Sequence, residues 1–142
     1  MKFTRHTPDE SYIVKAYRPG QLTLHCLDAE ATAQTAAQGQ VLTKDLLFND
    51  SIILSPGKPV TRWQPRCFAE LQLEHLRQIN PLQPEMVLLG TGEHLNFPEQ
   101  AWMMEFLEAG IGFEVMDTAA ACRTYNILSS EGRQPVAALL VN

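Results

Sequence analysis

The sequence is poor in cysteine and in charged residues. Only three of its 142 residues are cysteine, and 19% are charged. Cys26, Cys67 and Cys122 are odd in number and far apart, which fits neither a disulfide framework nor a zinc site, because structural zinc sites usually draw their ligands in close pairs. The four histidines are equally dispersed. We therefore expect free thiols, no metal site and no cofactor.

Long apolar segments and clusters of positive charge are also lacking. No run approaches the roughly 20 apolar residues of a membrane-spanning helix, and the N-terminal segment turns acidic where a signal peptide needs an apolar core. The eleven Lys and Arg residues are scattered through a chain of net charge −5. Nucleic acid attracts clustered positive charge. We predict a cytoplasmic protein with no membrane span and no nucleic-acid partner, although docking on a membrane complex would leave no such mark.

The length and the apolar content are typical of one globular domain. A chain of 142 residues, 45% of them hydrophobic, has room for one core. We expect a single domain over residues 1–142.

The N-terminal half predicts antiparallel strands. Residues 12–17 and 22–27 are β-prone and are joined by a Pro-Gly turn, which favours a hairpin. Residues 28–40 are rich in Ala and Gln without an apolar stripe, so they form a surface loop or a short helix. Two further strands flank Asn49 and Asp50. A helix is expected over residues 68–79, and Trp63 is interpreted as a core residue rather than a ligand-stacking one.

The C-terminal half predicts a parallel unit. Apolar residues 86–89 and 112–116 flank a helical segment at 98–109, which is a βαβ pattern. A second helix begins at Asp117 or Thr118, and residues 136–141 form the last strand. The predicted fold class is α/β: one layered domain with a central mixed sheet, helices packed on it and an N-terminal antiparallel β layer.

Two strand ends predict a small crevice. Gly90, Thr91 and Gly92 follow the first parallel strand, and Asp117 and Thr118 follow the second, so parallel pairing places them side by side. Helix N-termini there present free amides to an anion. The candidate ligand-binding residues are Gly90, Thr91, Gly92, Asp117, Thr118, Arg123 and Tyr125. In the alternative interpretation the glycines only permit a tight turn, and Asp117 only caps the helix.

Two other features have competing interpretations. Cys122 lies in the first turns of a helix and could be a nucleophile, but a buried, inert thiol fits the surrounding alanines better. The helix at 98–109 has more apolar residues than one stripe requires. Trp102, Met103 and Phe106 are therefore the candidate patch for a protein partner or a second copy, against complete burial.

The segment from LLGTG through GIGFEVMDTAAACRTYNILSSEGR to the closing apolar strand resembles the small Mth-domain family of uncharacterised proteins. Mitochondrial relatives in that family include an assembly factor for respiratory complex I. The resemblance implies a layered α/β fold with an added β layer, and it transfers no catalytic residue. It is loose before residue 51.

The leading hypothesis is a non-enzymatic binding or assembly module. Its partner is a protein, for example a respiratory or membrane-associated complex. The alternative is a small-anion-binding protein or an unassigned enzyme acting at the crevice near Thr118 and Arg123.

Overall fold

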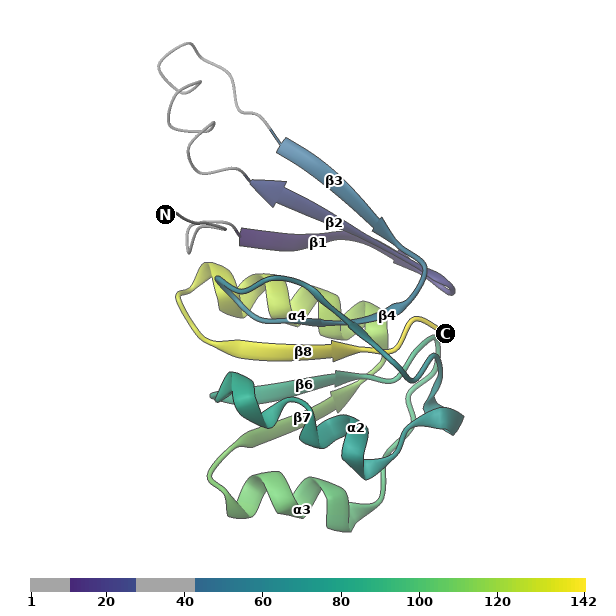
Figure 1. Ribbon diagram of the computed structural model, residues 1–142, viewed down its shortest axis with the longest axis vertical. Helices are drawn as coiled ribbons and strands as arrows, with labels where there is room; N and C mark the ends of the chain where they lie inside the picture. The colour runs from purple at the N-terminus through teal and green to yellow at the C-terminus, as the bar shows by residue number, and fades with distance from the viewer. Residues whose placement is uncertain (1–10, 28–42) are drawn as a thin grey trace.

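The computed structural model describes residues 11–27 and 43–142, which form two sheets with helices packed on the larger one (Figure 1). The predicted loop or short helix at residues 28–40 lies outside the described residues. The larger sheet has the strand order β5-β4-β8-β6-β7. Its strands are β4 (Ser51–Leu54), β5 (Thr61–Trp63), β6 (Met86–Gly90), β7 (Gly112–Met116) and β8 (Pro135–Leu139).

The larger sheet is mixed, as the sequence predicts. β6 pairs in parallel with β7 and with β8, whereas β4 pairs antiparallel with β8 and with β5. The predicted βαβ unit is confirmed, with α3 (Gln100–Glu108) connecting β6 to β7. A parallel connection needs such a crossover, since a tight turn can join only antiparallel strands.

The smaller sheet is the predicted N-terminal antiparallel layer. It consists of β1 (Ser11–Arg18), β2 (Gln21–Leu27) and β3 (Thr43–Phe48) in that order. The predicted hairpin is confirmed: Arg18 pairs with Gln21, and Gly20 has a φ of 89°, a conformation that glycine adopts without strain.

The central strands are covered on both faces, which explains their continuous apolar runs. Side chains along β8 and just beyond it alternate between two core clusters. Ala137, Leu139 and Val141 belong to one cluster, and Val136, Ala138 and Leu140 belong to the other.

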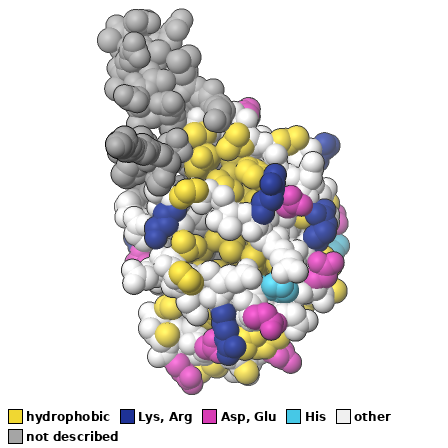
Figure 2. Space-filling model, in the orientation of Figure 1, with side chains coloured by type: hydrophobic (Ala, Val, Ile, Leu, Met, Phe, Trp, Pro, Cys, Tyr) yellow, Lys and Arg dark blue, Asp and Glu magenta, His cyan; other side chains and the backbone are white. Residues whose placement is uncertain are grey.

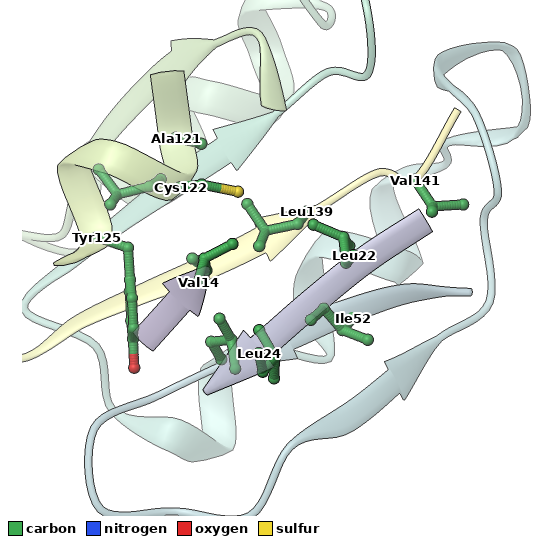
Figure 3. Close-up of a cluster of buried hydrophobic side chains, with 12 residues drawn as sticks. Val14, Leu22, Leu24, Ile52, Ala121, Cys122, Tyr125, Leu139 and Val141 are labelled. Atoms are coloured by element: carbon green, nitrogen blue, oxygen red, sulfur yellow. The ribbon is translucent and has the colours of Figure 1, made fainter. Parts of the chain in front are cut away.

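Each face of the central sheet has a different cover. α4 (Thr118–Ser130) and the three-stranded sheet pack on one face, around the cluster that Figure 3 shows. There Leu22 and Leu24 of β2, Ile52 of β4 and Tyr125 of α4 belong to one buried cluster. α2 (Leu73–Arg77) and α3 lie on the opposite side (Figure 1). The layered fold class is thereby confirmed.

Two local predictions differ from the structure. The strands that flank Asn49 and Asp50 exist, but they belong to different sheets: β3 pairs with β2, whereas β4 is buried along its whole length and pairs with β8 and β5. At the corner between them, Arg66 donates to the carboxylate of Asp50 and to the carbonyl oxygen of Asn49. The predicted helix at 68–79 is broken. A 3₁₀ turn at Phe68–Glu70 is followed by extended Leu71, whose side chain is buried in the core, and only then by α2.

Candidate functional site

The two predicted strand ends lie side by side. Gly90 is in register with Met116, the amide of Thr91 donates to the carbonyl oxygen of Met116 at 2.9 Å, and the amide of Thr118 donates to the carbonyl oxygen of Gly92 at 2.9 Å. Asp117 caps α4, since its carboxylate accepts a hydrogen bond from the amide of Ala120 at 2.8 Å. The sequence therefore placed these two turns correctly relative to each other.

The space between the turns is filled by the chain itself. Thr118 is completely buried, and its hydroxyl donates to the carbonyl oxygen of Leu140 at 2.7 Å while it accepts from the amide of Gly92 at 2.8 Å. A Cβ on Gly92 would collide with the carbonyl oxygen of Asn142, and one on Gly90 would lie 2.9 Å from the Thr118 hydroxyl. The glycines thus serve the close approach of the C-terminal segment.

Thr91 is also engaged within the chain. Its side chain is 2% exposed, and its hydroxyl donates to the carbonyl oxygen of His94 at 2.7 Å and accepts from the amide of Asn96 at 3.2 Å. An anion at this place would compete with hydrogen bonds that the fold already makes. Ligand binding at the crevice stays a prediction, and its hydroxyls contribute to the fold.

Arg123 and Tyr125 both lie on α4, but their side chains have different environments, because Tyr125 is buried and Arg123 is exposed. Tyr125 is 2% exposed within the core, and burial raises the pKa of its phenol. Arg123 is exposed. It lines a cavity between α4 and β1, whose wall includes Ala119, the residue after Thr118.

The cysteine of α4 is an inert core residue in this geometry. Cys122 is 5% exposed, and burial raises the pKa of its thiol to about 12, although neighbouring Arg123 opposes that shift. A thiol with so high a pKa carries almost no thiolate near neutral pH. Across residues 11–27 and 43–142, no cluster of three or more His, Cys, Asp or Glu side chains could hold a metal ion.

The predicted partner patch is divided by the fold. Trp102 and Met103 are half-buried, but Phe106 is 2% exposed and its ring packs on Phe113 at a centroid distance of 5.2 Å. Including Phe106 in an exposed patch was therefore wrong. The outer side of α3 instead exposes Met104 and Leu107.

Trp102 opens onto a groove of about 390 Å³ between the N-terminal end of α3 and the 3₁₀ turn at Phe68–Glu70. We call it the Trp102 groove. It is lined by Phe68, Ala69, Leu71, Gln72, Phe97, Pro98, Glu99 and Trp102. Sequence reasoning missed Phe97, which is 65% exposed, and nearby Leu95, which is 52% exposed. Two large apolar residues in an otherwise polar loop were the signal that could have identified them.

Charges on the surface are mixed. On the face shown in Figure 2, Lys and Arg side chains lie among Asp and Glu side chains. Exposed ion pairs include Arg77 with Glu105 and Arg133 with Glu85, and hydrogen bonds from these arginines lower the pKa of both carboxyl groups. Among the described residues, no helix has the length and apolar character to span a membrane.

These features define a class: a small α/β domain with a parallel βαβ core, an added antiparallel layer and an open, largely apolar groove. The chain belongs to the family described as "Protein of unknown function (DUF498/DUF598)", which matches residues 33–140. Together with the similarity to a solved Mth938-like domain, this match confirms the predicted resemblance to Mth-domain proteins.

The chain has similar proteins in animals and in a bacterium. The chain is 29% identical over 107 residues to the NADH dehydrogenase (ubiquinone) 1 alpha subcomplex assembly factor 3 of Xenopus tropicalis, with 74% of this chain and 57% of that protein covered. It is 31% identical to the assembly factor of the same name from Danio rerio, with 80% and 68% covered. The 13 kDa major membrane protein of Francisella tularensis is 32% identical, with 61% and 71% covered. The chain thus spans little more than half of the Xenopus relative.

Solved structures share the fold. A crystal structure of a Bordetella parapertussis protein superposes with a TM-score of 0.72 at 33% identity, covering 93% of this chain and 97% of that one. A solution structure of a Bordetella pertussis protein, described as a Mth938-like domain, has a TM-score of 0.69 at 26% identity, with 99% and 91% covered.

Proposed function

We propose that this chain is a non-enzymatic protein-binding module that takes part in assembling a respiratory NADH dehydrogenase. The names of the Xenopus and Danio relatives support this role. The observation in this chain that supports the binding role is the Trp102 groove, which is open and has large apolar side chains at its surface.

The groove has the chemistry of a peptide or helix docking site. Phe97 is 65% exposed and Trp102 is half-buried, so a partner could remove a large aromatic area from water. The only formally charged side chain among the lining residues is Glu99. We therefore expect the partner segment to place apolar side chains in the groove and a basic residue beside Glu99.

The assembly role is tested in the native cell. Deletion of the chain is expected to reduce the amount of fully assembled NADH dehydrogenase, measured on native gels by in-gel NADH oxidation, and the wild-type chain is expected to restore it. An unchanged amount of assembled complex in the deletion strain would contradict the assembly role.

The groove is tested by complementation with a double variant, Phe97→Ser with Trp102→Ser. Truncating a central aromatic anchor costs about 2 kcal/mol of binding free energy, or about thirtyfold in affinity. Because Trp102 also packs on the core cluster, the stability of the purified variant is measured in parallel, and we expect a folded protein that does not restore assembly. Ile127→Ser is the matched control, because Ile127 is 56% exposed on α4 and lies outside the groove. Full rescue by the double variant would show that the groove is not the docking site for the partner.

At the described strand ends, the hydrogen bonding does not favour the alternative of a small-anion site or an enzyme. The hydroxyls of Thr91 and Thr118 are used by backbone groups, and the C-terminal residues lie against Gly92. A cytoplasmic location and assembly into a homo-oligomer stay predictions.

A further inference from the structure

The free edge of β1 faces α4. β1 pairs only with β2 in its sheet, so its other edge has no strand partner among the described residues. One residue of that edge is satisfied by a side chain: the amide of Val14 donates to Oδ1 of Asn126 at 2.9 Å, and the carbonyl oxygen of Val14 accepts from Nδ2 of Asn126 at 2.9 Å. The carboxamide of Asn126 thus acts as a one-residue strand partner.

Beyond Val14 the edge opens. The register of β1 shifts between Val14 and Ala16, which makes Lys15 the extra residue of a bulge. Tyr17 pairs with Leu22, next to the pair Arg18 and Gln21 that closes the hairpin. Because backbone groups in an antiparallel ladder alternate in direction, those of Tyr17 point away from β2 and toward the open edge.

A cavity of about 200 Å³ lies beside this open edge. One wall is residues 14–17 of β1, and the other is a single stripe of α4. The helical stripe consists of Ala119, Cys122, Arg123 and Asn126. The volume is that of about seven water molecules in the liquid, enough for a side chain and a short piece of backbone but not for a folded element.

Two residues that line the cavity carry a formal charge, Lys15 and Arg123. The ammonium of Lys15 points away from the cavity, because it donates to Asp45 of β3, beyond β2, at 2.7 Å. Arg123 forms no ion pair with any residue in the described part of the chain. Among the described residues, the acidic groups near this site are Asp45, and Glu93 and Asp117 on the side of the Tyr17 phenol. Within that part of the chain, Arg123 therefore leaves a positive charge without a paired carboxylate at the wall of the cavity.

We propose that this cavity receives an extended, acidic segment of a partner protein, which pairs its backbone with β1 at Tyr17 and sets a carboxylate against Arg123. Addition of a strand between an edge strand and a helix is a known mode of peptide recognition, in which backbone hydrogen bonds give affinity and side-chain pockets give specificity. Guanidinium binds carboxylate in a bidentate geometry, which favours this charge over a neutral side chain.

The cavity is separate from the Trp102 groove. Trp102 and Phe68 pack on the core cluster of the α2 and α3 face, whereas Val14 and Cys122 belong to the cluster of the opposite face. The inference therefore does not depend on the proposed function, and each is tested without the other.

The probe is the peptide acetyl-Val-Glu-Val-amide, titrated into the full chain and followed by amide NMR shifts and hydrogen exchange. We expect shifts centred on Ala16, Tyr17 and Arg123, together with slower exchange of the Tyr17 amide. The neutral peptide acetyl-Val-Gln-Val-amide is expected to bind about tenfold more weakly, which is the size of one charge-assisted hydrogen bond.

Variants separate this site from nonspecific attraction. Arg123→Gln is expected to weaken binding of the Glu peptide about tenfold. Lys58→Gln removes the same charge from an exposed turn outside the cavity and is expected to leave binding unchanged. The Phe97→Ser and Trp102→Ser double variant is also expected to bind the peptide normally.

Three outcomes would overturn the proposal: no shifts at β1, equal weakening by Lys58→Gln, or the same shifts and Tyr17 protection with acetate alone. The last outcome would mean a small-anion site without strand pairing.

Discussion

The hydroxyl of Thr118 joins segments that are far apart in the chain. It accepts a hydrogen bond from the amide of Gly92 and donates one to the carbonyl oxygen of Leu140, and both hydrogen bonds are buried. Buried polar groups of this kind cost more when they lose a partner than they contribute when paired. Thr118 therefore connects the ends of β6 and β8 to the start of α4.

Thr118→Val preserves the shape of the side chain and removes the hydroxyl. It leaves the Gly92 amide and the Leu140 carbonyl without this partner, so we expect the free energy of unfolding to fall by about 2–4 kcal/mol. Chemical denaturation measures the change.

Thr124→Val on the same helix is the control. Thr124 is half-buried, and its hydroxyl meets only the weak acceptor Sδ of Met116 at 3.5 Å. For Thr124→Val, the free energy of unfolding should fall by less than about 1 kcal/mol. Equal losses for the two variants would contradict the role of Thr118.

α4 contacts both sheets. Ala121, Cys122 and Tyr125 pack in the cluster shared with the central sheet, while Asn126 binds the edge of β1. Small side chains in the first turns let the helix lie close to the central sheet, where Thr118 almost touches Gly90. The helix thereby fixes the position of the three-stranded layer.

Asn126→Ala removes the side-chain partner of the Val14 backbone. We expect a loss of about 1–3 kcal/mol in stability and an exchange rate of the Val14 amide that is at least about tenfold faster, measured by native-state hydrogen exchange. Ile127→Ala is the control, since Ile127 is exposed on the neighbouring position of the helix. Unchanged protection of Val14 in Asn126→Ala would show that the side chain does not close the edge.

On the scale of the whole molecule, each face of the central sheet buries an apolar cluster, while other large apolar residues stay at the surface. Phe106 lies in the α2 and α3 core against Phe113, whereas Phe97, nine residues earlier in the chain, is 65% exposed. The same residue type thus has two roles, and only the packing distinguishes them.

Phe106→Ala is expected to reduce the free energy of unfolding by about 3–5 kcal/mol, because it leaves a cavity in a closed core. Phe97→Ser should change it by less than about 0.5 kcal/mol, since the side chain is largely in water already. Thermal or urea unfolding of both variants checks the contrast. A large loss in Phe97→Ser would mean that the Trp102 groove is part of the core.

Local pattern predicted the C-terminal half well. The apolar run before Gly90, the helix that follows Pro98 and the cap at Asp117 depend on residues close together in sequence, and all three were confirmed. The helix expected over residues 68–79 was broken, because Leu71 turns into the core in an extended conformation. Tertiary burial there overrode local helical preference.

The sequence by itself determined the family, the βαβ unit and the N-terminal hairpin, because apolar periodicity, proline and glycine act over a few neighbouring residues. Only the tertiary structure decided which side chains are available to a ligand or a partner. In the folded chain, Thr118 is buried against Leu140 and Phe106 lies in the core. Phe97 and Arg123 lie at the surface. Exposure depends on segments that meet from distant parts of the chain, and no local pattern encodes that meeting.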